Sequence, residues 1–460
     1  MNFNIDQSNI DQSNIDQSSK QIFNESQQEA FDKYLNGENI FITGPGGSGK
    51  SFFIQQIYKH AINNNKRIQV TAMTGCAAIL LDSAAKTLHS WANIGLATGS
   101  IEDLSNKIKK SNLKRANWTN TSILVVDEVS MMSQKILELL DITGKKCLRN
   151  QKSFGGIQLI FSGDFYQLPP VGSSSDETSS KFCFESPLWN TIFPSENNIE
   201  FNHIFRQDDE VFKKLLNEIR YGKLFRSSLA ILEQCVGKKP PPDNLIKPTI
   251  LYPTKRMVDN MNQDEMLKLI TEDYTFSSSI IQDNSLTGRK YTSPELEYEI
   301  NNLNNNSLCE KMLCLRVGAQ VMCVANLDMS SRFPIVNGSQ GVITEMTTSG
   351  LPIVKFLNGA EMTISHHTWR SEKIPSIGLK QIPLILAWAI TIHKAQGITL
   401  EQAEIDAGSS IFECGQTYVA LSRVKKLSGL YLTSLDPQKI RVKKKVREFY
   451  ANLQLNKSIK

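Results

Sequence analysis

The sequence lacks the patterns that announce a metal site, a disulfide framework or a membrane span. Its eight cysteines include no CxxC pair, and its six histidines fall at no zinc-ligand spacing, so reduced, mostly buried thiols are the simplest interpretation. The longest apolar stretch, Ile382–Ile392, is far shorter than the ~20 residues that cross a bilayer. We interpret it as a buried strand and expect no membrane partner.

The opening segment also lacks the features of a leader peptide. No arginine precedes Arg67, acidic residues are present, and there is no apolar core, so neither a secretory signal nor a mitochondrial presequence is recognised. With reduced cysteines, this predicts an intracellular protein of the nucleus, the cytoplasm or a viral factory. Residues 4–18 are three polar copies of NIDQS that cannot bury a face, and we predict a disordered tail over residues 1–20.

A strong charge of one sign is absent from the chain as a whole. Lys plus Arg number 51 and Asp plus Glu 46, and the formal net charge of +5 is too small to indicate a polyanionic partner. From Leu421 to Lys460, however, eleven basic residues accompany two acidic ones. This basic C-terminal segment is either a solvated helix face or a set of phosphate contacts. Phosphate contacts would predict that charge reversal at Lys443, Lys444 and Lys445 flattens the salt dependence of nucleic-acid affinity.

The 460 residues are enough for about three compact units. From Ile40, short β-rich runs alternate with helical stretches: NIFITG, RIQVTAMT, SILVVDE and IQLIFSGD. This alternation predicts a parallel sheet flanked by helices, which binds ligands beyond the carboxyl ends of its strands.

A second region of the same kind begins near Phe205, with helical periodicity in VFKKLLNEIRYGKL and strands in TILYPT and AWAITIH. Between those strands, residues 272–308 are polar and turn-rich. Residues 316–380 alternate like short antiparallel strands, in AQVMCVAN, QGVITEM, LPIVKF and AEMTIS. We interpret residues 316–380 as an inserted small β-barrel.

A phosphate-binding loop is predicted where GPGGSGKS follows the strand NIFIT and precedes a helix. Its glycines let backbone N–H groups surround phosphate oxygens at a helix N-terminus. Lys50 is expected to reach the β- and γ-phosphates of ATP, and Ser51 to hold Mg²⁺. The predicted nucleotide contacts here are Gly44, Pro45, Gly46, Gly47, Ser48, Gly49, Lys50 and Ser51.

Two further strand ends carry candidate catalytic residues. In VVDEVSM, Asp127 is placed to hold Mg²⁺ and Glu128 to deprotonate the attacking water. In FSGDFYQLPPV, Gln167 could contact the γ-phosphate and report its loss, although the same stretch is equally a proline turn that closes a strand.

These motifs resemble those of the Pif-type (petite integration frequency) helicases of superfamily one, which are related to RecD. The resemblance covers about Phe23 to Leu432. The segments that carry it, in order, are FNESQQ, TGCAAILL, TLHSW, FGGIQLIFSGDFYQLPPV, NHIFRQ, VGAQVMCVANLD, VNGSQGVI, AWAITIHKAQGITL and FECGQTYVALSRVKKLSGL.

The resemblance implies an α/β fold with two RecA-like parallel-sheet P-loop domains and a small Src-homology-type β-barrel inserted in the second. The first core is expected over residues 21–204, with a small wedge-type insertion at about 91–118. The second core is expected over 205–315 and 381–450, interrupted by the barrel at 316–380. A basic tail is expected over 451–460.

The resemblance also assigns residue roles. Gln27 matches the position that reads adenine, Gly397 a nucleotide contact, and Arg206 and Arg423 the arginines that stabilise transition-state charge on the γ-phosphate. The polar positions that line the family's single-strand channel are matched by Thr74, His89, Thr391 and His393. Lys394 is adjacent to the last of these and is included among the predicted DNA contacts.

Some of these assignments have a structural alternative. His89 alone is more typical of a core histidine than of a DNA contact. Phe165, Trp91 and Trp388 could stack on bases but are equally plausible core residues.

The sequence therefore predicts an ATP- and Mg²⁺-dependent DNA helicase that moves along single-stranded DNA, 5′→3′ by family resemblance. Its expected partners are single-stranded and forked or structured DNA, its expected state is a monomer, and its expected roles lie in replication, repair, recombination or telomere maintenance. One alternative is a nucleic-acid-binding module that ATP switches without strand separation. Another is a P-loop phosphotransferase, which would leave the second core and its arginines without a task.

Overall fold

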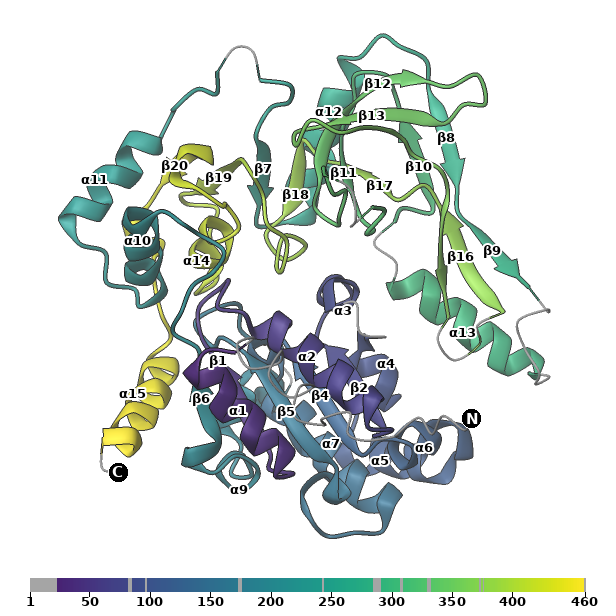
Figure 1. Cartoon of the computed structure of the whole chain (residues 1–460), viewed down its shortest axis with the longest axis vertical. Helices are drawn as coiled ribbons and strands as arrows, with labels where there is room; N and C mark the ends of the chain where they lie inside the picture. The colour runs from purple at the N-terminus through teal and green to yellow at the C-terminus, as the bar shows by residue number, and fades with distance from the viewer. Residues whose placement is uncertain are drawn as a thin grey trace, which may run out of the picture.

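The computed structural model describes residues 23–458 except 82–84, 96, 173–175, 242–243, 284–290, 307–308, 329–331, 372–373 and 375. The predicted NIDQS tail, residues 1–20, lies outside the described residues. Figure 1 shows two α/β units, one beneath the other, with a β-rich unit beside the upper one. This arrangement confirms the predicted fold class.

The first core is built on a six-stranded sheet with the order β3-β2-β4-β5-β1-β6, in which all neighbours are parallel. Its strands are β1 (Ile40–Thr43), β2 (Ile68–Ala72), β3 (Lys86–Thr87), β4 (Ile123–Asp127), β5 (Gln158–Gly163) and β6 (Asn198–Glu200). Every residue of β1 and β4 is buried, as expected for strands covered on both faces. The four β-rich runs of the first region are confirmed as β1, β2, β4 and β5.

Helices cover both faces of this sheet and fill its connections. They are α1 (Glu25–Leu35), α2 (Lys50–Asn63), α3 (Gly75–Leu81), α4 (Leu88–Ala92), α5 (Ile101–Lys110), α6 (Asn112–Thr119), α7 (Gln134–Leu148), α8 (Glu177–Ser180) and α9 (Trp189–Ile192). Short 3₁₀ turns are η2 (Val129–Met131), η3 (Ser153–Gly156), η4 (Cys183–Glu185) and η5 (Ser195–Asn197).

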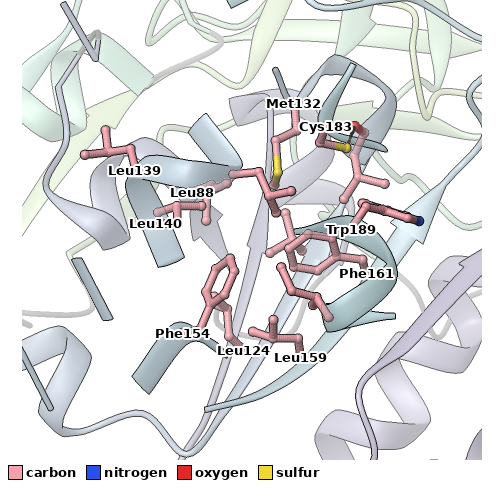
Figure 2. Packing of buried hydrophobic residues seen from close by; sticks show 14 of the residues in the cluster. Leu88, Leu124, Met132, Leu139, Leu140, Phe154, Leu159, Phe161, Cys183 and Trp189 are labelled. Carbon is pink, nitrogen blue, oxygen red and sulfur yellow. Dashed lines mark hydrogen bonds between the residues drawn. The ribbon is translucent and has the colours of Figure 1, made fainter. Parts of the chain in front are cut away.

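The main apolar cluster of the first core lies between the sheet and α7. Figure 2 shows Leu124, Leu159 and Phe161 of the strands packed near Phe154 and Trp189. The opposite face of the sheet packs against α1 and α2 in a second cluster. Both clusters bury the sheet, so that only the strand ends remain available for chemistry.

The aromatic side chains considered for base stacking belong to the core. Phe165 and Trp91 are each 1% exposed, and Trp388 is 6% exposed. Trp91 packs on Trp118 with 4.6 Å between ring centroids, which anchors the helices of the predicted 91–118 insertion to the first core. The stacking interpretation is wrong for these three residues because packing leaves no ring face free for a base.

The second core contains a four-stranded parallel sheet with the order β18-β7-β19-β20. Its strands are β7 (Thr249–Tyr252), β18 (Ala389–Thr391), β19 (Ala403–Ala407) and β20 (Leu430–Leu435). Its helices and 3₁₀ turns are α10 (Glu210–Arg220), α11 (Arg226–Cys235), α12 (Lys255–Leu267), α14 (Gln416–Leu421), η7 (Leu427–Gly429) and η8 (Pro437–Lys439). The strands expected in TILYPT and AWAITIH are β7 and β18.

Antiparallel sheets fill the space between β7 and β18 in the chain. One has the order β14-β13-β12-β11-β17, and two smaller ones pair β10 with β8 and β16 with β15 and β9. Their strands are β8 (Tyr274–Ser277), β9 (Ser279–Gln282), β10 (Met312–Leu315), β11 (Gln320–Cys323), β12 (Gln340–Met346), β13 (Pro352–Phe356), β14 (Glu361–Thr363), β15 (His367–Arg370), β16 (Ile377–Gln381) and β17 (Leu384–Leu386), with the helix α13 (Ser293–Asn306). The four antiparallel strands predicted within 316–380 are confirmed as β11 to β14.

The apolar stretch 382–392 is two strands rather than the single strand predicted. β17 pairs antiparallel with β11, whereas β18 pairs parallel with β7. The chain leaves one sheet and enters the other at Ala387 and Trp388, both buried. An unbroken apolar run does not reveal this change of sheet, because strands buried in either sheet require apolar residues.

The C-terminal helix α15 (Lys444–Ser458) returns to the first core. Residues 451–458, expected as part of a basic tail, continue this helix. Val446, Phe449, Tyr450 and Leu453 recur at helical spacing and pack into the main cluster of the first core. Residues 444–450, expected in the second core, therefore pack with the first. Among the described helices, none has the length and apolarity to span a membrane.

Candidate nucleotide site and nucleic-acid contacts

A cavity of about 480 Å³ lies where the two cores meet. Predicted site residues that line it are Gly46, Gly47, Ser48, Gly49, Lys50, Ser51, Asp127, Glu128, Gln167, Arg206, Gly397 and Arg423. Gln27, Gly44 and Pro45 are not among its lining residues. The cavity thus brings residues at the carboxyl ends of β1, β4 and β5 together with two arginines of the second core.

Two glycines of the loop between β1 and α2 illustrate why this loop requires glycine. Gly47 has φ +83°, and a Cβ there would collide with Cβ of Arg206. Gly49 has φ +86°, and a Cβ would lie 2.8 Å from Nε2 of Gln27. The left-handed backbone and the absence of side chains expose the amides at the N-terminus of α2 to the cavity.

Lys50 is the first residue of α2 and bends back over this loop. Its Nζ donates hydrogen bonds to the carbonyl oxygens of Gly44 at 2.7 Å and Pro45 at 2.9 Å. Burial lowers the pKa of Lys50, while the negative charges of Asp164 and Glu128 oppose that shift. The half-buried ammonium at the loop's edge is placed to meet phosphate oxygens.

Asp127 and Glu128 stand where β4 ends. Burial raises the pKa of both carboxyl groups, and for Glu128 the pKa rises to about 7, with the neighbouring charge of Asp127 as the second cause. Glu128 also has φ +57°, an uncommon backbone conformation for a residue with a side chain. Strain and a raised pKa at one carboxylate are typical of a catalytic base.

Gln396, which the sequence analysis did not single out, connects two of the predicted residues. Its Nε2 donates to Oε2 of Glu128 at 2.8 Å and lies 3.5 Å from Oε1 of Gln167. Its Oε1 is buried without a partner. Gln396 directly precedes Gly397 in the segment AWAITIHKAQGITL, so its position in that motif is the signal that could have found it.

Tyr418 on α14 is a second residue that sequence reasoning missed. It is 3% exposed, and its Oη accepts a hydrogen bond from the backbone N–H of Gly46 at 3.0 Å. Burial raises the pKa of this phenol, so it remains protonated. The contact ties the phosphate-binding loop directly to the second core.

Arg206, which is half-buried, and Arg423, which is buried, bring two positive charges to the cavity. Arg206 Nη1 donates to the carbonyl of Ser422 at 3.3 Å, and Arg423 Nη2 donates to Ser422 Oγ at 2.8 Å. Burial lowers both pKa values, and that of Arg206 falls to about 9, with the charge of Arg423 as the second cause. In the described part of the chain, no carboxylate forms an ion pair with either guanidinium. Two cations that lack an ion-pair partner in the described part of the chain fit a polyanion such as a triphosphate.

Gln27 and Phe205 lie at the rim beside Gly49. Gln27 Oε1 accepts the backbone N–H of Asn24 in a capping box at the start of α1, which fixes the side chain. Its Nε2 is buried without a partner. Phe205 is 54% exposed, lines the cavity and packs near Gly49. The unpartnered amide donor of Gln27 and the exposed ring of Phe205 suit a purine base. The sequence analysis did not predict Phe205, although it directly precedes Arg206.

The residues predicted to hold Mg²⁺, Ser51 and Asp127, both line the cavity. Among the described residues no cluster of three or more His, Cys, Asp or Glu side chains could bind a metal without other ligands. One hydroxyl and one carboxylate fit Mg²⁺, which proteins commonly bind through one or two side chains together with substrate phosphates and water.

The five predicted DNA contacts lie outside the nucleotide cavity. Thr74 Oγ1 accepts the N–H of Ala77 at 3.2 Å, and Thr391 Oγ1 accepts that of Lys394 at 3.1 Å. Each hydroxyl thus supports a turn and still has a hydrogen to donate. His89 and His393 are half-buried, and burial lowers the pKa of each imidazole. Lys394 is exposed.

The helix α15, which forms the end of the basic C-terminal segment, lies at a different edge of the first core from Thr74 and His89. Thr74 follows β2 and His89 follows β3, at one edge of the first sheet, whereas α15 contacts η5 beside β6 at the other edge. In Figure 1, α3 and β18 lie toward the antiparallel sheets and α15 on the other side of the first core. The structure therefore separates α15 from Thr74 and His89.

The fold and the cavity together define a P-loop protein with two RecA-like cores. The chain belongs to the PIF1-like helicase family, whose profile matches residues 14–228, with the 2B domain of the DNA helicase Pif1 matching residues 298–346.

Individual relatives agree with this family. The ATP-dependent DNA helicase PIF1 of Emericella nidulans is 33% identical over 91% of this chain and 61% of its own length. The crystal structure of the Candida albicans Pif1 helicase is 32% identical with a TM-score of 0.73, covering 94% of this chain and 99% of that one. The Bacteroides Pif1 helicase in complex with ADP-AlF3 and single-stranded DNA is 27% identical with a TM-score of 0.63, covering 94% and 97%. The chain spans about two thirds or less of the curated relatives' length.

Proposed function

We propose that this protein is an ATP-dependent DNA helicase that moves along single-stranded DNA and couples ATP hydrolysis to strand separation, as an intracellular protein of replication, repair or genome maintenance. The observation that carries this proposal is the cavity in which Lys50 and Glu128 of the first core face Arg206 and Arg423 of the second. Two arginines that form no ion pair with a described carboxylate, opposite a phosphate-binding loop, give the second core a task that a simple P-loop phosphotransferase would not need.

In the proposed reaction, the phosphate-binding loop and Lys50 bind the ATP phosphates, and Glu128 accepts a proton from the attacking water. Gln396 orients the Glu128 carboxylate, and Gln167 contacts the γ-phosphate side. Ser51 and Asp127 would hold Mg²⁺, which supplies charge neutralisation on the phosphates when bound. Gln27 and Phe205 receive the base.

The arginines make hydrolysis depend on closure of the two cores. Arg206 and Arg423 stabilise negative charge that develops on the transferring phosphoryl group, an effect worth ~10³ to 10⁵ in rate. Since both arginines belong to the second core, they act only when that core is closed against the phosphate-binding loop. Release of phosphate then permits the cores to separate, and alternation of the two states drives movement on DNA.

The single-stranded DNA in the Bacteroides complex supports the same ligand here. Contacts from Thr74 and His89 in the first core, and from Thr391, His393 and Lys394 in the second, would place one strand across both cores. We propose 5′→3′ movement by family membership, forked or structured DNA as the duplex substrate, and a monomer in solution.

The decisive experiment is strand displacement on a forked duplex with ATP and Mg²⁺, comparing the unmodified chain with Lys50→Ala. We expect displacement by the unmodified chain only, with single-strand affinity retained in the variant. Hydrolysis and DNA binding without displacement would instead identify an ATP-switched binding module. Undiminished hydrolysis by Lys50→Ala would falsify the assignment of the site.

A further inference from the structure

Asp164 is a buried carboxylate that the proposed mechanism leaves without a role. It directly follows β5 and is 0% exposed. Arg220, on α10 of the second core and 1% exposed, pairs with it through two bonds, from Nε to Oδ2 at 2.9 Å and from Nη2 to Oδ1 at 3.0 Å. A bidentate buried pair of this kind is strong and geometrically specific.

Aromatic rings enclose the pair and bring in a third element. The Arg220 guanidinium lies 4.7 Å from the ring centroid of Tyr166, 5.2 Å from that of Tyr221 and 5.7 Å from that of Tyr450 on α15. The rings exclude water and add cation–π attraction. The pair therefore joins the first core, α10 and the C-terminal helix at one point.

The same joint reaches the phosphate-binding loop. Tyr450 Oη lies 2.6 Å from Oγ1 of Thr43, the last residue of β1, and accepts the backbone N–H of Phe165 at 3.1 Å. Gly44 and the loop follow Thr43 directly. A shift of α10 or α15 would therefore displace the residues at which the phosphate-binding loop begins.

Lys50 lies at the same turn, because its Nζ donates to the carbonyl oxygen of Gly44, the residue after Thr43, at 2.7 Å. Of the charges that raise the pKa of Lys50, that of Asp164 is the largest, ahead of Glu128 and Asp127. With Arg220 in place, the Asp164 carboxylate is already satisfied. Without it, the carboxylate would keep the backbone N–H of Tyr166 at 3.2 Å but lose its counter-charge, and Lys50 would be the cation left to neutralise it.

We propose that Arg220 is a positioning residue of the ATPase centre, which holds Asp164 so that Lys50 stays free for the ATP phosphates and which thereby links the position of α10 to the phosphate-binding loop. This inference rests on the proposed ATPase function. Arg220 itself touches no substrate.

The test compares Arg220→Met, Asp164→Asn and the double variant, with Lys213→Met as the matched control. Lys213 is a cation on the same helix, pairs only with exposed Glu210 at 2.8 Å and lies outside the nucleotide cavity. KM and kcat for ATP with saturating single-stranded DNA, and the unfolding temperature, are measured for each variant.

For Arg220→Met we expect KM for ATP to rise by about 5- to 150-fold, more than kcat falls, because the binding contact of Lys50 is diverted. The double variant should recover most of the KM, since it has no carboxylate left to attract Lys50. Lys213→Met should match the unmodified chain. A lower unfolding temperature with unchanged KM in Arg220→Met, or a double variant as impaired as the single one, would overturn the positioning role.

Two milder variants keep the proposal testable if Arg220→Met does not fold. Arg220→Lys keeps the charge without the planar fork and should show an intermediate KM, and Tyr450→Phe removes one hydroxyl and should raise KM by less. Unchanged KM in both would contradict the proposal. Lys50→Ala separates the two claims: if it still hydrolyses ATP, the proposed function fails, whereas an inactive Lys50→Ala beside a normal Arg220→Met rejects the positioning role alone.

Discussion

Single buried side chains decide the chemistry at the residue scale. Glu128 sits at the end of β4 beside another carboxylate, and burial together with the charge of Asp127 raises its pKa to about 7. A base with a pKa near the working pH combines a large deprotonated fraction with a strong drive to accept a proton. Burial of a carboxylate lowers the stability of the fold, so a carboxylate that has no function in catalysis or binding is rarely buried in this way.

This pKa predicts the pH dependence of hydrolysis. Glu128 must be deprotonated to act, so kcat/KM for ATP should be level above about pH 7 and fall by about tenfold per pH unit below it. Steady-state kinetics across that range, in buffers of constant ionic strength, measure the profile. An acid limb near 4.5, the ordinary value for a glutamate, would show that burial does not tune this residue.

At the scale of elements, α15 shows how a segment remote in the chain completes a core. Val446 and Tyr450 are buried in the cluster that β4, β5 and α7 form, and Phe449 lies 4.4 Å, centroid to centroid, from Phe184. The stripe of apolar residues on this helix has no surface to bury in the second core, and packing against the first removes it from water.

We therefore expect Tyr450→Ala to destabilise the first core by about 3–5 kcal/mol, since a large buried ring is lost. Denaturant unfolding followed by the fluorescence of Trp91, Trp118 and Trp189 reports on that core. Lys445→Ala, on the exposed side of the same helix, is the control and should change stability by less than about 0.5 kcal/mol. Equal stability of the two variants would mean that α15 does not stabilise the first core.

At the scale of the whole molecule, the nucleotide cavity forms only where both cores contribute. Gly46 bonds to Tyr418, and Gln396 bonds to Glu128, so loops of one core are held by side chains of the other. Thr391 ends β18, and the loop that follows carries His393 and Gln396. Closure around ATP and contact with DNA therefore involve the same segment, which predicts coupling between the two ligands.

Glu128→Gln tests that coupling. The amide keeps the shape of the side chain but cannot accept a proton, so ATP should bind and remain unhydrolysed, and the closed state should hold single-stranded DNA more tightly with ATP than with ADP. Fluorescence anisotropy with a labelled oligonucleotide measures this, beside Arg423→Ala. If turnover is lost and the affinity is the same with ATP, ADP or no nucleotide, an ATPase attached to an uncoupled DNA-binding module is the better description.

The placement of α15 favours the solvated-face interpretation of the lysines at its start over phosphate contacts. Lys443 pairs with Glu413, Lys444 and Lys445 lie near Glu448, and the helix sits at the sheet edge opposite Thr74 and His89. Charge reversal at these three lysines should leave the slope of log affinity against log salt for single-stranded DNA unchanged. A flatter slope would show that the strand does reach α15 and would restore the phosphate-contact interpretation.

The sequence by itself determined what local chemistry controls. The strand, the glycines and Lys50 are contiguous, and the parallel-sheet rule places Asp127 and Gln167 at the same edge as that loop without any knowledge of packing. The antiparallel strands between the two cores follow in the same way from their alternation. Family resemblance added Arg206 and Arg423, which no local pattern distinguishes from surface arginines.

Only the tertiary structure decided the rest, because it depends on contacts between residues that are far apart in the chain. Gln396 meets Glu128 across a separation of 268 residues, and Tyr450 meets Thr43 across 407. Two further features depend on which surface a segment packs against. They are the division of the apolar run 382–392 between two sheets and the packing of α15 on the first core. Hydrophobicity makes burial favourable but does not specify the partner surface; that is determined by the fit of complementary shapes and charges once the chain has folded.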